Sequence, residues 1–484
     1  MAAVLRLQEK VPVETLAQNV RNARAMGIST HYEPEEIKKI SGPSQSDYDA
    51  LIAKLKGEGF KVTQESPTHL WLSVQADSSN FERVFSTRIV SPRPGIHHNL
   101  DVASVPSHLS LVASVIGLDN THKRHPLYHQ MSGAMDAPGG VPQATIKSAY
   151  GFNAIYASGV TGKGQDIAIA TYDGFNIDDV KYFYTQANLS PGIDEVDFNG
   201  KADYVEGSAM ETQLDAEFSG MIAPGANVHV FPSAANSDAG ELQMFTAILD
   251  DNRAKVVNYS WGACETNLTP AHAAEMDKVF ARAVAQGVNI VVASGDSGSD
   301  SCGDGTNAAD WPAAHPDVVA VGGTTFTANG DGYGSEAAWS GSGGGISALW
   351  ASPAYQAKLT APYNTKRSYP DVAFNADPSS GQAVYAHNQG TAGWIVIGGT
   401  SMAAPQWSGF LALVGESRAS VKNLAPLGFL NPHIYALTDA QRAAVFHDVT
   451  SGSNGLYSAG PGFDAVTGLG SMQADQLLAI LSSN

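Results

Sequence analysis

The chain has 484 residues, of which 43% are hydrophobic and 49 are glycine, and its formal net charge is −19 at pH 7. This length predicts two folded units joined by a linker rather than one core. The negative charge argues against a nucleic-acid partner, because phosphate contacts need clustered Lys and Arg. No stretch approaches the roughly 18 to 20 apolar residues that span a bilayer, so we expect no membrane partner. Residues 1–12 lack the apolar run of a secretory signal.

The charge is divided unevenly between two parts of the chain. Residues 1–130 carry 14 basic and 13 acidic side chains, whereas the rest carries 14 basic and 34 acidic side chains. Such an excess of carboxylates suits a domain that works in acid, where protonation reduces their mutual repulsion. It equally suits simple solubility, so the charge alone leaves both interpretations open.

Residues 1–120 have the pattern of a small α/β module. Ser46 is predicted to cap a helix that ends at Gly57, strands follow at 60–63 and 70–74, and Ser79 opens a second helix. The helices are expected to bury apolar residues at helical spacing, namely Tyr48, Leu51, Ile52 and Leu55 in the first and Phe81, Val84 and Phe85 in the second.

Residues 121–142 lose this periodicity and gather His, Lys, Arg, Gly and Pro. This composition predicts an exposed, flexible linker where proteolytic cleavage concentrates. The second unit, residues 143–484, has short runs that are apolar on both faces and alternate with helical stretches. This pattern predicts a parallel sheet buried between helix layers. The runs are 166–171, 228–231, 255–259, 288–293 and 318–321.

Ser401 is the first candidate catalytic residue. It follows two glycines and directly precedes an apolar helix at 403–414. Glycine lets a substrate approach the backbone, and a helix N-terminus favours negative charge, so the position suits a nucleophile as well as a simple helix cap. A serine nucleophile needs a base, yet none of the 14 histidines is followed by Gly-Thr as in a histidine-dependent subtilisin.

Carboxylates are therefore the candidate partners of Ser401. Glu211 and Asp215 are four residues apart in a predicted helix at 209–221, so they lie on one face. Either they are solvated, or they are buried and share a proton, which lets one act as a base in acid. Asp296 follows the strand at 288–293, where a protonated carboxyl group could donate to an oxyanion, or simply occupy a turn.

Two further features are a glycine-rich loop and a cysteine pair. Asp448 and Asp464 frame the loop, and their carboxylates with nearby carbonyls are the hard oxygen ligands that calcium prefers, although turn aspartates are the simpler interpretation. Cys264 and Cys302 are too few for a disulfide framework. They could form one bridge or remain two buried thiols.

Taken together, the motifs resemble the sedolisin family of serine-carboxyl peptidases, especially its kumamolisin-like members. The resemblance covers nearly the whole chain. The matching segments are His31-Tyr-Glu-Pro-Glu-Glu36, Glu211-Thr-Gln-Leu-Asp215, Ser260-Trp-Gly262, Ser294-Gly-Asp-Ser-Gly298, Val321-Gly-Gly-Thr324, Ser342-Gly-Gly-Gly345, Tyr369-Pro-Asp-Val372, Gly399-Thr-Ser401 and Ala459-Gly-Pro-Gly-Phe-Asp464.

The resemblance implies a role for each residue. Ser401 would be the nucleophile, Glu211 the general base and acid, Asp215 its hydrogen-bonded partner and Asp296 the protonated oxyanion donor. It also implies one structural Ca²⁺, held by the side chains of Asp448 and Asp464 and the carbonyls of Val449, Gly460 and Gly462. Asp310 would line a substrate subsite.

The resemblance further implies a subtilisin-like fold behind a ferredoxin-like propeptide, and an exported monomer. Its substrates would be proteins and peptides, and its own propeptide would inhibit it until cleavage within 121–142. Two alternatives stay open: a pseudopeptidase that binds peptides without cutting them, and a histidine-dependent subtilisin with Asp173 as its acid.

Overall fold

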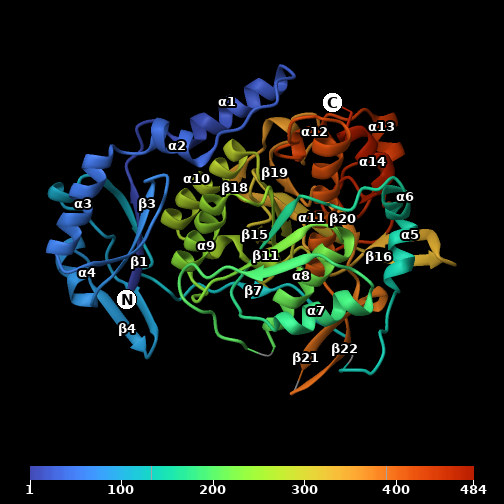
Figure 1. The fold of residues 1–484 in the computed structure, drawn as a ribbon, viewed down its shortest axis with the longest axis horizontal. Coiled ribbons are helices and arrows are strands. Elements are labelled where there is room, and N and C mark those ends of the chain that lie inside the picture. Colours follow the sequence, from blue (N-terminus) through green and yellow to red (C-terminus); the bar gives the residue numbers. More distant parts are fainter. Residues whose placement is uncertain (132, 206, 389, 484) are drawn as a thin grey trace.

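The computed structural model describes every residue except 132, 206, 389 and 484, and it contains two units (Figure 1). A small N-terminal module, blue in the figure, lies against one side of a larger C-terminal unit. We call them the prodomain (residues 1–120) and the catalytic unit (residues 143–484), after the roles that the resemblance implies. In the described part of the chain, no helix has the length and apolar character needed to cross a membrane.

The prodomain is a four-stranded antiparallel sheet with the strand order β2-β3-β1-β6. With helix α3 between β1 and β2 and α4 between β3 and β6, this is the predicted ferredoxin-like arrangement. Its elements are β1 (Ala2–Leu7), α1 (Val13–Ala25), α2 (Pro34–Ser41), α3 (Gln45–Gly57), β2 (Lys61–Glu65), β3 (Trp71–Gln75), α4 (Ser78–Phe85), β4 (Ile89–Arg93), β5 (Ile96–Asn99) and β6 (Val112–Ile116).

Three details of the prodomain differ from the sequence-based prediction. Ser44, not Ser46, caps α3 by accepting a hydrogen bond from the Asp47 amide at 3.2 Å. Helix α4 begins one residue before Ser79 and follows Asp77. Helix α1 was not predicted at all. Its apolar residues Val13, Leu16 and Ala17 are buried in the same cluster as the catalytic unit, so the reason for their burial appears only when the two units are together.

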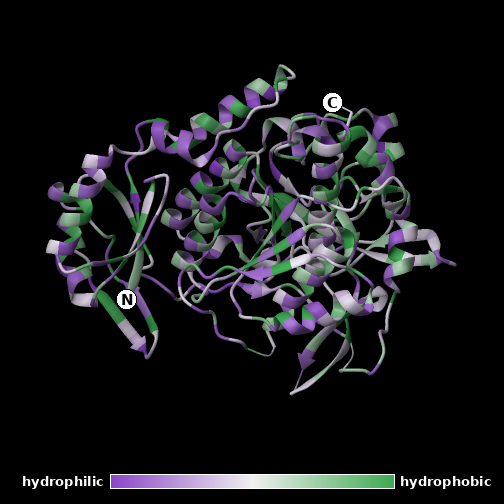
Figure 2. Ribbon diagram, viewed as in Figure 1, coloured by the Kyte–Doolittle hydropathy of each residue, from purple (hydrophilic) through white to green (hydrophobic). Residues whose placement is uncertain are grey.

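The prodomain sheet is buried on both faces. In β1, Ala3, Leu5 and Leu7 belong to the prodomain's own core, whereas Val4 packs in the same cluster as the catalytic unit. This follows from the alternation of side chains along a strand. Helix α1 lies along α10, and the Tyr32 amide donates to the Ala285 carbonyl at 2.8 Å. Figure 2 shows polar and apolar residues mixed along α1, as one buried and one exposed face require.

The catalytic unit contains a largely parallel sheet in the order β10-β11-β9-β12-β14-β16-β20-β24-β23, as predicted. Its elements are α5 (Gln143–Ala149), α6 (Phe152–Ala157), β9 (Asp166–Thr171), α7 (Ile177–Gln186), β10 (Gly192–Glu195), α8 (Ala209–Ile222), β11 (Asn227–Pro232), α9 (Asp238–Asp251), β12 (Val256–Tyr259), β13 (Trp261–Cys264), α10 (Pro270–Gln286), β14 (Asn289–Ala293), β15 (Asp310–Trp311), β16 (Val319–Asn329), β17 (Gly332–Ala338), β18 (Gly345–Ala351), β19 (Lys366–Tyr369), β20 (Val372–Asn375), β21 (Gln382–Asn388), β22 (Thr391–Gly398), α11 (Thr400–Glu416), α12 (Asn431–Tyr435), α13 (Asp439–Val445), β23 (Phe446–His447), β24 (Ser471–Met472) and α14 (Ala474–Leu481).

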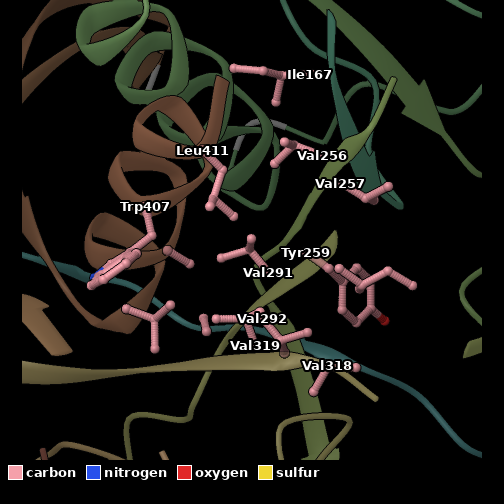
Figure 3. Packing of buried hydrophobic residues seen from close by; sticks show 14 of the residues in the cluster. Ile167, Val256, Val257, Tyr259, Val291, Val292, Val318, Val319, Trp407 and Leu411 are labelled. Carbon is pink, nitrogen blue, oxygen red and sulfur yellow. The ribbon is translucent and has the colours of Figure 1, made fainter. Parts of the chain in front are cut away.

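The centre of this unit is a helix packed on the sheet. Helix α11 is buried along almost its whole length, and Leu411 projects from it toward Val291 of β14 (Figure 3). The Trp407 indole donates to the Ala373 carbonyl of β20 at 3.0 Å. Helix α8 packs beside α11, whereas α9 and α10 adjoin the prodomain. Strands β9, β12 and β14 are apolar on both faces because helices cover both sides of the sheet. This packing fixes the N-termini of α8 and α11 at the carboxyl edge of the sheet.

Most described residues of the linker are exposed, as its composition predicts, but its first part is held against the catalytic unit. Its residues 125–126 form a strand, β7 (His125–Pro126), which pairs with Trp261 and Gly262 of β13 in antiparallel register. A second strand, β8 (His129–Gln130), pairs with β22. Arg124 and Leu127 are buried. Basic and proline-rich composition suggested exposure, but the partners that cover this segment lie far away in the sequence.

Candidate active site

Ser401 and Glu211 meet at the N-termini of two buried helices. The Ser401 hydroxyl donates to Glu211 Oε2 at 2.9 Å, and a weaker contact joins it to the Ser260 carbonyl at 3.3 Å. Both side chains are fully buried, so water does not compete for this hydrogen bond. The structure thus brings together the two residues that the sequence singled out as nucleophile and base.

Asp215 lies one turn beyond Glu211 on α8 and is also fully buried. Its Oδ1 accepts from the Ser260 hydroxyl at 2.7 Å. Glu211 Oε1 and Asp215 Oδ2 are both buried without a donor, and a proton held by the pair supplies one. Burial, and then the charge of Asp215, raise the pKa of Glu211 well above its usual range, and burial likewise raises the pKa of Asp215.

The negative charge of this pair is best placed on Glu211. Its Oε2 accepts from two groups, the Ser401 hydroxyl and the Leu127 amide, the latter at 2.9 Å. Two donors on one oxygen stabilise its ionised form. The pair can therefore accept a proton from Ser401 while Asp215 stays protonated behind it.

Asp296 lies across the site, three residues beyond the end of β14. Its Oδ1 accepts from the backbone amide and the hydroxyl of Thr400, at 2.7 and 2.8 Å. Burial raises the pKa of Asp296 to about 7. Its Oδ2 is buried without a hydrogen-bond donor, and in acid that oxygen can carry a proton and act as a donor itself.

The linker occupies the space between these groups. The Ser401 amide donates to the Leu127 carbonyl at 3.0 Å, and the Leu127 amide donates to the Ser260 carbonyl at 3.2 Å. A cavity of about 620 Å³ adjoins this segment and includes Asp296 and Asp310 in its lining. The carbonyl that faces the nucleophile therefore belongs to the chain itself.

Gly399 is required by this close approach. Its φ is +114°, and a Cβ there would lie 2.5 Å from both Asp296 Oδ2 and the Leu127 carbonyl oxygen. Any side chain would collide with the carboxyl group and with the peptide that it faces.

Several contributing residues were not predicted from the sequence. Ser260 was noted only as part of a motif, yet its hydroxyl bonds Asp215 and its carbonyl faces both Leu127 and Ser401. Thr400 positions Asp296. No local pattern distinguishes these side chains from ordinary buried serines and threonines. The sequence contains one signal for Leu127, because it is an apolar residue between two histidines of the linker.

A histidine base has no support in this geometry. Among the described residues, Ser401 Oγ has Glu211 and the Ser260 carbonyl as its hydrogen-bond partners, not an imidazole. The nearby His129 belongs to the linker and lies 3.4 Å from Asp296 Oδ2. The Asp173 carbonyl accepts from Thr212 of α8 at 3.0 Å, and its side chain is bonded to Ser208 at the start of that helix.

The C-terminal loop brings the predicted calcium ligands close together. Gly462 donates its amide to Asp448, at 3.0 Å to Oδ2, and Gly460 donates its amide to Asp464 Oδ2 at 3.1 Å. Two carboxylates and adjoining carbonyls, including that of the buried Val449, fit a hard cation. Among the described residues no group of three or more His, Cys, Asp or Glu could hold a metal, so an ion here depends on carbonyls.

The two cysteines, which the sequence left open, form a disulfide between Cys264 and Cys302. It joins the end of β13 to the loop after Asp296, and both cysteines line the cavity beside the linker. The bridge therefore ties together two walls of the site.

Comparison with known proteins gives the following matches. The subtilase family model matches residues 66–433, and the model of the pro-kumamolisin activation domain matches residues 1–121. The chain is 34% identical to kumamolisin from Bacillus sp. (strain MN-32), over 99% of this chain and 91% of that protein. It is 27% identical to tripeptidyl-peptidase 1 from Canis lupus familiaris, over 99% of this chain and 90% of that protein.

A solved structure agrees with these matches. Pseudomonas sedolisin, a serine-carboxyl proteinase complexed with two molecules of pseudo-iodotyrostatin, aligns with 72% of this chain and 99% of its own. The TM-score is 0.63 and the sequence identity is 30%.

The close contact at Gly399 leads to a test. In a Ser401→Ala background, Gly399→Ala should displace the linker, because the new Cβ would lie 2.5 Å from the Leu127 carbonyl oxygen. Trypsin should then cut rapidly after Lys123 or Arg124, as followed by gel and mass spectrometry. Gly57→Ala, which adds a Cβ in open space, is the control. Unchanged resistance to trypsin in the Gly399 variant would contradict the geometry.

Proposed function

Because the chain belongs to the subtilase family, as a serine-carboxyl peptidase made in proenzyme form, we propose that it is an endopeptidase active in acid. Its first substrate is its own linker. One observation carries the proposal: the Ser401 hydroxyl is bonded to Glu211 while the Ser401 amide holds the carbonyl of Leu127. A peptide carbonyl thus lies beside an activated hydroxyl, which is the starting geometry for acyl transfer.

The proposed mechanism assigns one role to each group. Ser401 Oγ attacks the Leu127 carbonyl carbon while Glu211 takes the hydroxyl proton, and Asp215 supports the base. The oxyanion accepts hydrogen bonds from the Ser401 amide and from protonated Asp296. Glu211 then gives its proton to the amine of Tyr128, which leaves, and water hydrolyses the acyl group from Ser401.

The path of the linker supports an endopeptidase rather than an enzyme that removes tripeptides. Before Leu127 the chain continues through Pro126 and His125 to Arg124, which is itself held by hydrogen bonds. An enzyme that removes tripeptides needs a cleft that is closed after the third residue before the cleaved bond. Here the cleft also binds a fourth residue, Arg124. On the other side, β8 pairs with β22 and extends the contact beyond the cut.

We propose that the prodomain keeps the enzyme inactive until it meets acid. It covers α9 and α10 and delivers the linker to the cleft. In acid its carboxylates become neutral while its Lys and Arg side chains stay charged, so its positive charge grows and loosens its fold. The Cys264–Cys302 disulfide supports an oxidising location, and we propose that the protein is secreted.

Incubation of the purified precursor at about pH 4 tests the proposal directly. We expect intact-mass spectrometry to show cleavage between Leu127 and Tyr128, because this carbonyl is the one bonded to the Ser401 amide. Further trimming would follow. Ser401→Ala should leave the 50.6 kDa chain whole, and the exposed Ser335→Ala should behave as wild type.

Two outcomes would overturn this assignment. Processing by Ser401→Ala would exclude the proposed nucleophile. A precursor that stays whole and a wild-type chain that does not digest casein would instead indicate a pseudopeptidase.

Activity should fall as the pH rises through about 7, because burial raises the pKa of Asp296 to about 7 and only its protonated form donates to the oxyanion. In Asp296→Asn the amide donates at every pH, so this alkaline fall in kcat/KM should move upward or disappear. Asp296→Ala, which has no donor, should lose about 100-fold to 1000-fold in kcat. A fall near neutrality that persists in the Asn variant would exclude Asp296 as its source.

We propose that Asp448 and Asp464, with the carbonyls of Val449, Gly460 and Gly462, hold one structural Ca²⁺. Adding Ca²⁺ to chelator-treated Ser401→Ala precursor should raise its melting temperature by several degrees, since an ion that binds only the folded state stabilises it. Asp448→Asn should abolish this rise, whereas Asp331→Asn on an exposed turn should keep it. Equal responses of the two variants would locate the ion elsewhere.

A further inference from the structure

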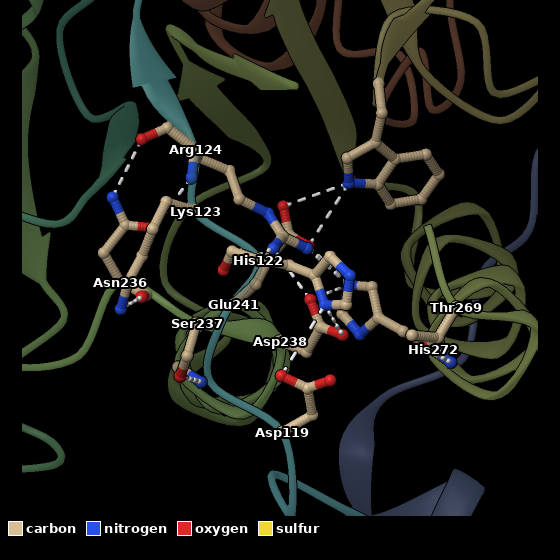
Figure 4. Close-up of polar contacts among 12 residues, drawn as sticks. Asp119, His122, Lys123, Arg124, Asn236, Ser237, Asp238, Glu241, Thr269 and His272 are labelled. Carbon is tan, nitrogen blue, oxygen red and sulfur yellow. Dashed lines mark hydrogen bonds and ion pairs between the residues drawn. The ribbon is translucent and has the colours of Figure 1, made fainter. Parts of the chain in front are cut away.

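Arg124 is the most deeply buried charge of the linker. Its side chain is 1% exposed and lies between Asp238 and Glu241 on the first turn of α9 and His272 on α10 (Figure 4). Its Nη1 donates to Asp238 Oδ1 at 2.7 Å and its Nη2 to Glu241 Oε2 at 2.5 Å. We call Asp238, Glu241, His272 and Trp311 the arginine pocket.

The side chains of the pocket are also bonded to one another and to their neighbours in the catalytic unit. Glu241 accepts from the Tyr259 hydroxyl at 2.9 Å and from the Trp311 indole at 3.2 Å. His272 Nε2 lies 2.6 Å from Glu241 Oε2 and 2.8 Å from Arg124 Nη2. These side chains come from α9, α10, β12 and β15, all in the catalytic unit. Cleavage of the linker therefore removes none of them from the catalytic unit.

The pocket has a fixed place relative to the reaction. Leu127 precedes the bond that faces Ser401, so Arg124 is the fourth residue before that bond. Asn236 fixes the backbone at this position, because its Oδ1 accepts from the Arg124 amide and its Nδ2 donates to the Arg124 carbonyl, both at 2.9 Å. Any peptide that pairs with β13 as the linker does will place its fourth residue here.

Charge makes the pocket selective. Glu241 is fully buried and Asp238 is 5% exposed, so two carboxylates face one space from which water is largely excluded. Burial alone would raise the pKa of Glu241, but the charges of Arg124 and His272 outweigh burial and hold it well below its usual range. A neutral side chain would leave the two buried carboxylates with His272 alone as their neighbouring cation, which costs free energy.

We propose that the arginine pocket is a specificity subsite, which selects substrates with arginine at the fourth position before the cleaved bond. This inference rests on the proposed peptidase function. Arginine fits better than lysine because its two terminal nitrogens reach separate carboxylates at once, whereas an ammonium group is a single point of charge.

Internally quenched peptides that copy residues 121–131 test the proposal. The position of Arg124 is filled by arginine, citrulline, lysine or leucine, and the self-processed enzyme is assayed with each. Citrulline keeps the shape but not the charge. We expect kcat/KM for arginine to exceed that for citrulline by about 10-fold to 100-fold, the usual loss for a hydrogen-bonded charge. Equal rates, or a preference for leucine, would overturn the proposal.

Variants of the enzyme locate the preference. Glu241→Gln and Asp238→Asn should each reduce the ratio of arginine to citrulline rates, while the exposed Asp251→Asn, at the other end of α9, should leave it unchanged. A ratio that survives in Glu241→Gln and Asp238→Asn would place the recognition elsewhere. If one variant fails to fold, the other variant and the peptide series with the wild-type enzyme still test whether the pocket selects arginine.

Comparison with the precursor separates the remaining outcomes. If Arg124→Gln slows self-cleavage but free peptides show no preference, the pocket serves only to dock the linker, and the proposal is wrong. Lys123→Gln is the matched control, because Lys123 is exposed and bonds only the Asn236 carbonyl. If no peptide is cut at all, the peptidase function itself fails, which is a distinct result.

Discussion

The structure depends on one contact, in which a serine at the start of α11 faces both a buried carboxylate and a peptide carbonyl. Ser401 can make both bonds because its hydroxyl and its amide point into the same space. Everything around it preserves this geometry. The sheet fixes the two helices, the prodomain delivers the linker, and Gly399 leaves room for the linker beside Asp296. A proton shared between acids takes the place of an imidazole.

The same constraint explains why the acids are buried so deeply. An exposed pair of carboxylates four residues apart on a helix would simply lose both protons in neutral water. Burial separates their titrations, so that Glu211 can carry the charge while Asp215 keeps its proton. It also brings the pKa of Asp296 to about 7. Burial thus raises the pKa of both the base, Glu211, and the acid, Asp296, and it restricts the two groups to the same range of pH.

Much of the fold follows from local patterns. Strands β9, β11, β12 and β14 and helices α8 and α11 were predicted within a few residues because apolar runs and helical spacing are strong signals. The strand predicted at 318–321 is longer than expected, because β16 continues to Asn329. Helix α1 was missed because its burial depends on α10, far away in the sequence. The burial of Arg124 in an otherwise mostly exposed linker was missed for the same reason, because its partners Asp238 and Glu241 are far away in the sequence. Sequence patterns indicate the local structure that a segment prefers, but not the distant residues that it contacts in the fold.

The double burial of the prodomain sheet has a consequence for the direction of activation. Val4, Val13 and Leu16 share their packing with the catalytic unit, so a departing prodomain carries this apolar surface into water. A fragment with such a surface is prone to unfold or aggregate, and a peptidase readily degrades an unfolded fragment. In the proposed activation, the enzyme would therefore degrade its own inhibitor, which makes maturation irreversible.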